Sequence, residues 1–168
     1  MTSSSIQDEV YVSPGEFRFA GAAARFHTLL GSCVSITLWH PRLYIGGICH
    51  FMLPARVTPV TQIKLDGRYA DDSIQLFLGE IKKRNTRPEE YLAKIFGGSN
   101  MFPLHRREGC IDVGWRNIEA ARGLLARSGF RVVAEDVGGN THRRLIFDLT
   151  NGNVWIKQDK KSVLSDIC

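Results

Sequence analysis

The segment over residues 34–52 constrains the fold of this chain more than any other. Apolar and hydroxyl side chains alternate over residues 34–39, a period of two that is typical of a β-strand with one buried face. A second apolar run follows at 45–52. Pro41 lies between them, and proline cannot occupy a central strand, so it marks a turn. The sequence therefore predicts an antiparallel hairpin.

The expected register of this hairpin brings two chemically useful side chains together. A turn centred between Pro41 and Arg42 places Cys33 directly opposite His50, where Cβ atoms lie roughly 4.5–5.5 Å apart. The same register places Cys49 on the opposite, apolar face. We therefore expect Cys33 beside a histidine and Cys49 in the core.

A thiol beside an imidazole is suited to amide hydrolysis. A neighbouring imidazolium lowers the pKa of a cysteine and so supplies thiolate, while the histidine can also transfer protons during the reaction. Gly31 and Ser32, just ahead of Cys33, allow a tight turn that directs N–H groups at a developing oxyanion. The spacing alone also allows the alternative that both residues have only a structural role, because cysteines near strands are usually packing residues and histidines on strands often are too.

The remaining patterns predict an α+β fold, a single layered domain of mixed β-sheet with helices packed on it. Apolar residues at helical spacing predict helices over about 71–84 and 115–128. Asp71 or Asp72 is the expected N-cap of the first, and Gly129 the expected C-cap of the second. Asn151-Gly152 predicts a tight hairpin turn. Strands are expected at about 34–39, 45–52, 91–96, 130–136, 143–149 and 153–158.

Length and composition favour one soluble domain. The chain has 168 residues and a net charge of +5. We expect a flexible N-terminus over 1–13, the domain over 14–158 and a basic tail over 159–168. Neither a spanning apolar run nor an export signal is evident, so a cytoplasmic protein with free thiols and no membrane insertion is expected. The scattered basic residues do not favour nucleic-acid binding.

No cofactor or metal is expected. His105, Cys110 and His142 lack the pairwise spacing of a zinc site. The glycine runs at 97–98 and 138–139 lack the pattern of a phosphate loop. These runs either supply backbone donors near a substrate or form tight turns between strands, and turns are favoured.

Several motifs resemble the chemoreceptor glutamine deamidase family, CheD, over roughly residues 10–157. The resemblance begins with Thr-Leu-Leu-Gly-Ser-Cys-Val at 28–34 and His-Phe-Met-Leu-Pro at 50–54. Their occurrence in the same order along the chain is more specific than any one motif. The further motifs are Tyr69-Ala70-Asp71, Phe96 to Phe102, Asp112 to Asn117, Ala134 to Asn140 and Arg143-Arg144.

The resemblance implies an α+β fold like that of bacterial toxin deamidases. It also implies hydrolysis of glutamine side-chain amides on methyl-accepting chemotaxis receptors, with Cys33 as nucleophile and His50 as base and acid. Thr28 is the implied third member, although the spacing leaves His27 as an alternative. A further implication is binding to a CheC-type CheY-phosphate phosphatase, and a mainly regulatory role through that phosphatase is the alternative function.

Overall fold

The computed structural model describes residues 7–57, 64–102 and 112–159. Within them the strands form two sheets, one ordered β1-β3-β8-β9 and one ordered β2-β5-β4-β6-β7. The elements are β1 (Asp8–Tyr11), β2 (Phe17–Ala20), β3 (Ala24–Leu30), β4 (Val34–His40), β5 (Ile45–Phe51), α1 (Ala70–Lys83), a 3₁₀ turn (Pro88–Glu90), β6 (Leu92–Gly97), α2 (Val113–Arg127), β7 (Arg131–Val137), β8 (Arg143–Asp148) and β9 (Val154–Gln158).

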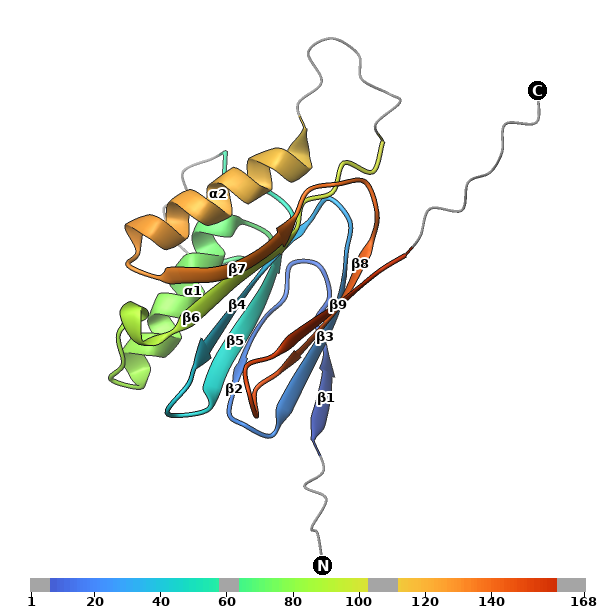
Figure 1. Ribbon diagram of the computed structural model, residues 1–168. Helices are drawn as coiled ribbons and strands as arrows, with labels where there is room; N and C mark the ends of the chain where they lie inside the picture. Colours follow the sequence, from blue (N-terminus) through green and yellow to red (C-terminus); the bar gives the residue numbers. More distant parts are fainter. Residues whose placement is uncertain (1–6, 58–63, 103–111, 160–168) are drawn as a thin grey trace, which may run out of the picture.

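The molecule has three layers (Figure 1). Both helices cover one face of the five-stranded sheet, and the four-stranded sheet packs against its other face. Ile36 of β4 and Ile74 of α1 belong to the core between helices and sheet, whereas Phe26 of β3 and Ile48 of β5 belong to the core between the sheets. The predicted α+β class is confirmed, with the β-structure divided into two sheets.

The helices form where the apolar spacing predicts them. Ile74, Phe77 and Ile81 of α1 are buried, and Gly129 follows α2 with a φ of 81° as the predicted terminating residue. The predicted aspartate cap of α1 is wrong. Tyr69 occupies the N-cap without a side-chain hydrogen bond, because the helix begins at Ala70 and both aspartates lie inside its first turn.

The hairpin forms, but its register differs from the prediction. In the β4–β5 pair His50 lies opposite Ser35, and Cys49 lies opposite Ile36. The turn is therefore centred one residue later than expected, between Arg42 and Leu43. This change shifts the pairing by two residues, so every side chain keeps its face. Cys49 is fully buried in the core beneath the helices, as predicted.

Three strands were not predicted, and each lies before the hairpin. β1 falls within the segment expected to be loosely ordered, yet it pairs with β3 in parallel, from Asp8 opposite Ala24 to Tyr11 opposite His27. β3 in turn pairs antiparallel with β8 and so carries Thr28 into the interior. The polar composition of the first residues concealed β1, because this strand lies at the edge of its sheet with three of its four residues exposed.

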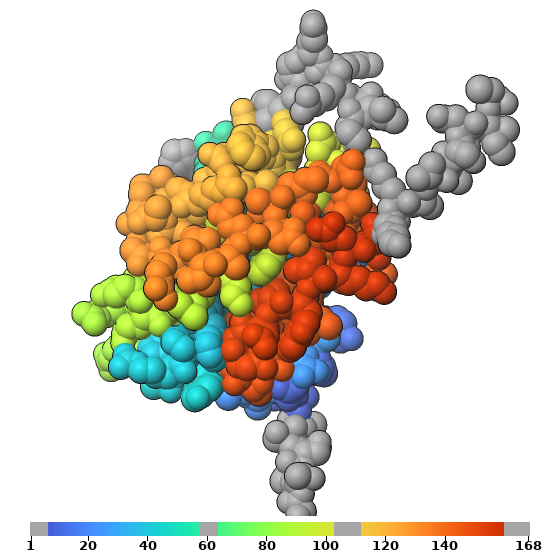
Figure 2. Space-filling model, in the orientation of Figure 1, coloured from blue at the N-terminus to red at the C-terminus, as the bar shows by residue number. Residues whose placement is uncertain are grey.

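The two sheets are joined by polar contacts as well as by their shared core. The predicted hairpin of β8 and β9 is present, although its connection is longer than two residues. Figure 2 shows α2 and β7, in shades of orange, beside the segment that contains β9, in red, on one face of the molecule. Arg143 of β8 is buried there and bonds Asp136 of β7, with Nη2 at 3.0 Å from Oδ1.

Candidate functional site

Cys33 lies in a three-residue turn between β3 and β4, and three hydrogen bonds from two other elements hold the backbone of this turn. The Gly98 amide donates to the Cys33 carbonyl at 2.8 Å, and the Ser99 amide donates to the Gly31 carbonyl at 2.9 Å. Asn117 of α2 donates from Nδ2 to the Ser32 carbonyl at 3.3 Å. All three carbonyls of the turn are therefore engaged by the protein. Among the described residues, no other residue accepts a hydrogen bond from the three N–H groups of the turn.

The Gly97-Gly98 pair explains why the turn can be held so closely. Gly97 has a φ of 102°, and a Cβ there would lie 2.3 Å from the Cys33 carbonyl oxygen. Such a φ is accessible mainly to glycine, and the contact leaves no room for a side chain. Gly97 is the last residue of β6, and Gly98 begins the segment that follows it, so this run does not form the favoured tight turn between two strands. The Gly98 amide donates to the cysteine turn, and donation to a substrate stays a prediction.

Ser99 connects this turn to the buried Arg143. The Ser99 hydroxyl lies 2.7 Å from Arg143 Nη1, and the same guanidinium nitrogen donates to the Gly138 carbonyl at 2.8 Å. Since the Ser99 amide binds the cysteine turn, Arg143 fixes the loop that holds Cys33. Arg143 belongs to a family motif, but nothing in its spacing predicts this contact.

His50 is buried between the sheets and is fixed through both backbone and side chain. Its amide donates to the Glu16 carbonyl at 3.1 Å, and its own carbonyl accepts from the Gly15 amide at 2.7 Å. Its Nδ1 lies 2.8 Å from Thr28 Oγ1. The Thr28 hydroxyl donates its proton to the Val12 carbonyl at 2.6 Å, so it must accept from His50. We assign the proton of the neutral ring to Nδ1, which leaves a lone pair on Nε2.

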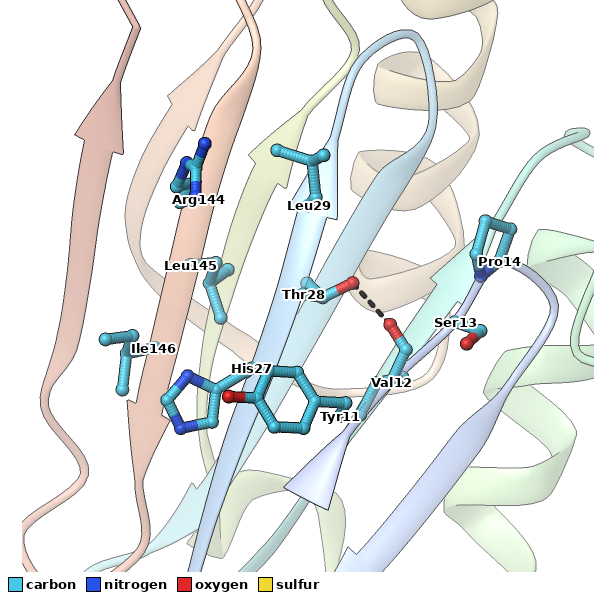
Figure 3. Close-up of a pocket in the computed structure, with 10 residues that line it drawn as sticks. All are labelled: Tyr11, Val12, Ser13, Pro14, His27, Thr28, Leu29, Arg144, Leu145 and Ile146. Carbon is cyan, nitrogen blue, oxygen red and sulfur yellow. Dashed lines mark hydrogen bonds between the residues drawn. The ribbon is translucent and has the colours of Figure 1, made fainter. Parts of the chain in front are cut away.

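The geometry distinguishes Thr28 from His27. Because side chains alternate along a strand, these neighbours lie on opposite faces of β3. His27 stacks on Tyr11 with ring centroids 4.9 Å apart and pairs with Glu9, away from His50. Figure 3 shows this arrangement, with the Thr28 hydroxyl directed at the Val12 carbonyl and the His27 ring beside Tyr11.

Cys33 and His50 share the space between the sheets but form no hydrogen bond to each other. Cys33 packs against the inter-sheet core, and it lies two residues before Ser35, the residue opposite His50. Diagonal neighbours of this kind remain within reach of each other's side chains. His50 Nε2 has no partner among the described residues. Catalytic hydrogen bonds often tighten only when a substrate binds.

Burial keeps both groups neutral. Desolvation raises the pKa of the Cys33 thiol above its usual value, an effect that its own backbone amide partly opposes. Desolvation also lowers the pKa of His50 from 6.5 to about 4. The expectation that an imidazolium supplies a preformed thiolate is therefore wrong for the resting protein. The arrangement suits a neutral histidine that removes the thiol proton during attack.

The open pocket beside Thr28 is a separate feature. It has a volume of about 650 Å³ and lies over the outward residues of β3 and β8, with Val12 to Pro14 along one side (Figure 3). Neither Cys33 nor His50 lines it. Its position therefore differs from the space in which the thiol would react.

In the described part of the chain, no three His, Cys, Asp or Glu side chains are grouped so as to hold a metal ion. His105, Cys110 and Cys168 lie outside the described residues. His142 precedes β8, and a Cβ built on Gly31 would lie 3.5 Å from its ring. Neither described helix is long and apolar enough to cross a membrane.

The sequence of this chain matches the family model described as CheD chemotactic sensory transduction over residues 52–158. The chain belongs to the CheD family. The probable chemoreceptor glutamine deamidase CheD of Pseudomonas fluorescens (strain SBW25) is 45% identical over 159 residues, which cover 94% of this chain and 89% of that protein. The probable chemoreceptor glutamine deamidase CheD 3 of Dechloromonas aromatica (strain RCB) is 47% identical over 150 residues, covering 88% and 86%.

CheD similarity extends beyond these relatives. A probable chemoreceptor glutamine deamidase CheD 1 of Leptospira interrogans is 35% identical over 156 residues, covering 89% of this chain and 92% of that protein. Among solved structures, YlmD from Geobacillus stearothermophilus has a TM-score of 0.49 at 12% identity, covering 80% of this chain and 61% of that chain.

Proposed function

We propose that this protein is a protein-glutamine deamidase that hydrolyses glutamine side-chain amides of chemoreceptors to glutamate and ammonia. The observation that carries the proposal is the hydrogen bond from His50 to Thr28. It leaves an unpaired Nε2 lone pair in the same inter-sheet space as the Cys33 thiol. The CheD relatives, named for this activity, support the choice of substrate.

The proposed reaction has two halves. Cys33 Sγ attacks the amide carbon while His50 Nε2 accepts the thiol proton, and the tetrahedral intermediate carries its negative charge on the former carbonyl oxygen. His50 then gives the proton to the departing nitrogen, so that ammonia leaves and a thioester remains. Water, activated by His50, then attacks the thioester. This step restores the thiol and releases the receptor with a glutamate side chain in place of glutamine.

The cysteine turn supplies the natural donors for the oxyanion. Its carbonyls are bound by Gly98, Ser99 and Asn117, whereas no other described residue accepts a hydrogen bond from its N–H groups. Preorganised amides of this kind stabilise charge that develops in the transition state. We infer that the amides of Ser32 and Cys33 bind the oxyanion.

The test is incubation of the purified protein with the cytoplasmic part of a chemoreceptor from the same organism. Ammonia release and conversion of specific glutamines to glutamates, mapped by mass spectrometry, are the expected results. Cys33→Ser should abolish both, while Cys49→Ser controls for the loss of a thiol elsewhere. Unchanged conversion with Cys33→Ser would overturn the mechanism.

Two further features rest on CheD membership alone and are proposed with it. Action on the cytoplasmic part of a receptor requires a cytoplasmic location. A CheC-type CheY-phosphate phosphatase is the proposed protein partner, and its addition should reduce receptor deamidation at constant enzyme concentration. No effect of saturating phosphatase, together with no complex in sedimentation, would remove that partner.

A further inference from the structure

Asn117 is an unusual residue for its place in the fold. It lies on the buried face of α2 next to Ile118, and it is fully buried. Its Nδ2 donates to the Met52 carbonyl at 2.8 Å and to the Ser32 carbonyl at 3.3 Å. Its Oδ1 is buried without a partner among the described residues. An orphaned acceptor costs free energy that an apolar residue at this position would avoid.

The two acceptors of Asn117 belong to the two chain segments that bear the proposed chemistry. Ser32 immediately precedes Cys33, and Met52 follows His50 by two residues. The amide has two N–H groups, and each serves one of these carbonyls. The orientation of the amide is thereby fixed, because the reverse orientation would place Oδ1 against both carbonyl oxygens.

The side-chain amide of Asn117 reaches these carbonyls because α2 packs very closely against the loop that precedes it. A Cβ on Gly114 would lie 2.4 Å from the Gly98 carbonyl oxygen, so only glycine permits this packing. Asn117 is three residues farther along α2. The same loop holds the cysteine turn through Gly98 and Ser99, so Asn117 completes a set of donors to that turn.

We propose that Asn117 is a positioning residue that holds the nucleophile turn and the histidine strand at a working separation. The inference rests on the proposed deamidase function. Cys33 and His50 form no hydrogen bond to each other in this structure, so their separation is set by the backbone around them. Among the described residues, Asn117 is a side chain that donates to both backbones. A misplacement of about 1 Å in such a pair can cost on the order of 10²-fold in rate.

The experiment compares two variants of Asn117 with a matched control on the same helix. Asn117→Leu keeps the number and branching of the side-chain heavy atoms but removes both donors, and Asn117→Asp keeps the shape but donates only when its carboxyl group is protonated. Leu125→Ala, in the core at the other end of α2, controls for general destabilisation. Circular dichroism identifies the temperature at which all variants are folded, and kinetics are measured there.

Asn117→Leu should lower kcat roughly 10- to 100-fold with little change in KM, since substrate contacts are retained. Asn117→Asp should recover activity relative to wild type as the pH is lowered, because protonation restores a donor. Alkylation of Cys33 by iodoacetamide should become faster in Asn117→Leu, because the released turn exposes the thiol. Leu125→Ala should change none of these readouts.

Wild-type kcat in Asn117→Leu would overturn the inference. The inference would also be overturned if the activity of Asn117→Asp equalled that of Asn117→Leu at every pH and the alkylation rate of Cys33 in both variants equalled that of wild type. Failure of the proposed function is recognised separately, because the wild-type protein would then release no ammonia from receptor. In that case the alkylation rates still decide whether Asn117 holds the cysteine turn.

Discussion

Thr28 and His50 belong to different sheets, and the hydrogen bond between Oγ1 and Nδ1, 2.8 Å long, orients the imidazole. The Thr28 hydroxyl is fixed in turn by the Val12 carbonyl. The position of one lone pair on His50 Nε2 therefore depends on contacts from the opposite layer of the molecule.

Replacing Thr28 by valine should reduce kcat by roughly 10- to 100-fold, because a buried N–H left without an acceptor costs about 1–3 kcal/mol and frees the ring to rotate. Thr28→Ser should restore much of the rate. Steady-state kinetics on receptor glutamines provide the measurement. His27→Ala is the matched control and should stay near wild type. The reverse order of these effects would place the third site residue at His27.

The buried His50 should make stability depend on pH. Its pKa is about 4 in the folded protein against 6.5 in the unfolded chain, so the unfolded state binds more protons between these values. The free energy of unfolding should therefore be unaffected by His50 above pH 6.5 and should fall by about 3 kcal/mol as pH decreases to 4. Urea titrations of wild type and His50→Gln across this range should show this His50-dependent decrease in the free energy of unfolding only in wild type.

The neutral state of the resting pair can be tested through the reactivity of Cys33. Because desolvation raises the pKa of its thiol, alkylation by iodoacetamide should be slower at neutral pH than alkylation of a free cysteine. His50→Gln should not slow this alkylation further. A strong decrease in rate on replacing His50 would instead reveal a preformed thiolate–imidazolium pair.

Gly97→Ala should inactivate the protein, and Gly138→Ala provides a control with a similar backbone. Both glycines have positive φ values, 102° and 76°, so each alanine meets a backbone penalty of about 1–2 kcal/mol. Only at Gly97 would the added Cβ also collide with the Cys33 carbonyl, at 2.3 Å, whereas nothing lies within 4 Å at Gly138. Activity and urea stability should fall much further for Gly97→Ala. Equal effects would show that the cysteine turn tolerates the displacement.

The sequence predicts the elements that carry strong periodicity and the pair of residues that we propose as nucleophile and base. The face shared by Cys33 and His50 was predicted although the register was wrong, because a two-residue change preserves alternation. The neutral state of the pair was not predictable, since it depends on burial beneath a second sheet. Thr28 is indicated only by the resemblance to CheD, because β3 lies before the hairpin and its partner β8 is far along the chain.

The role proposed for Asn117 could not be predicted from the sequence for a different reason. Its contacts with Ser32 and Met52 span 85 and 65 residues of sequence, so no local pattern indicates them. The same reason applies to Arg143, because its contact with Ser99 joins positions that are 44 residues apart. Both side chains are polar and buried, a combination that becomes evident only once the layers are assembled.

The division of the site between two layers also has a consequence for the newly made chain. Thr28 and His50 meet only after the two sheets have docked, and the turn of Cys33 is fixed only after α2 has packed on the loop that follows β6. A nascent or partly folded chain therefore carries an ordinary thiol and an unaligned imidazole. The proposed hydrolytic activity therefore requires both the docking of the two sheets and the packing of α2, and neither step alone would assemble the site.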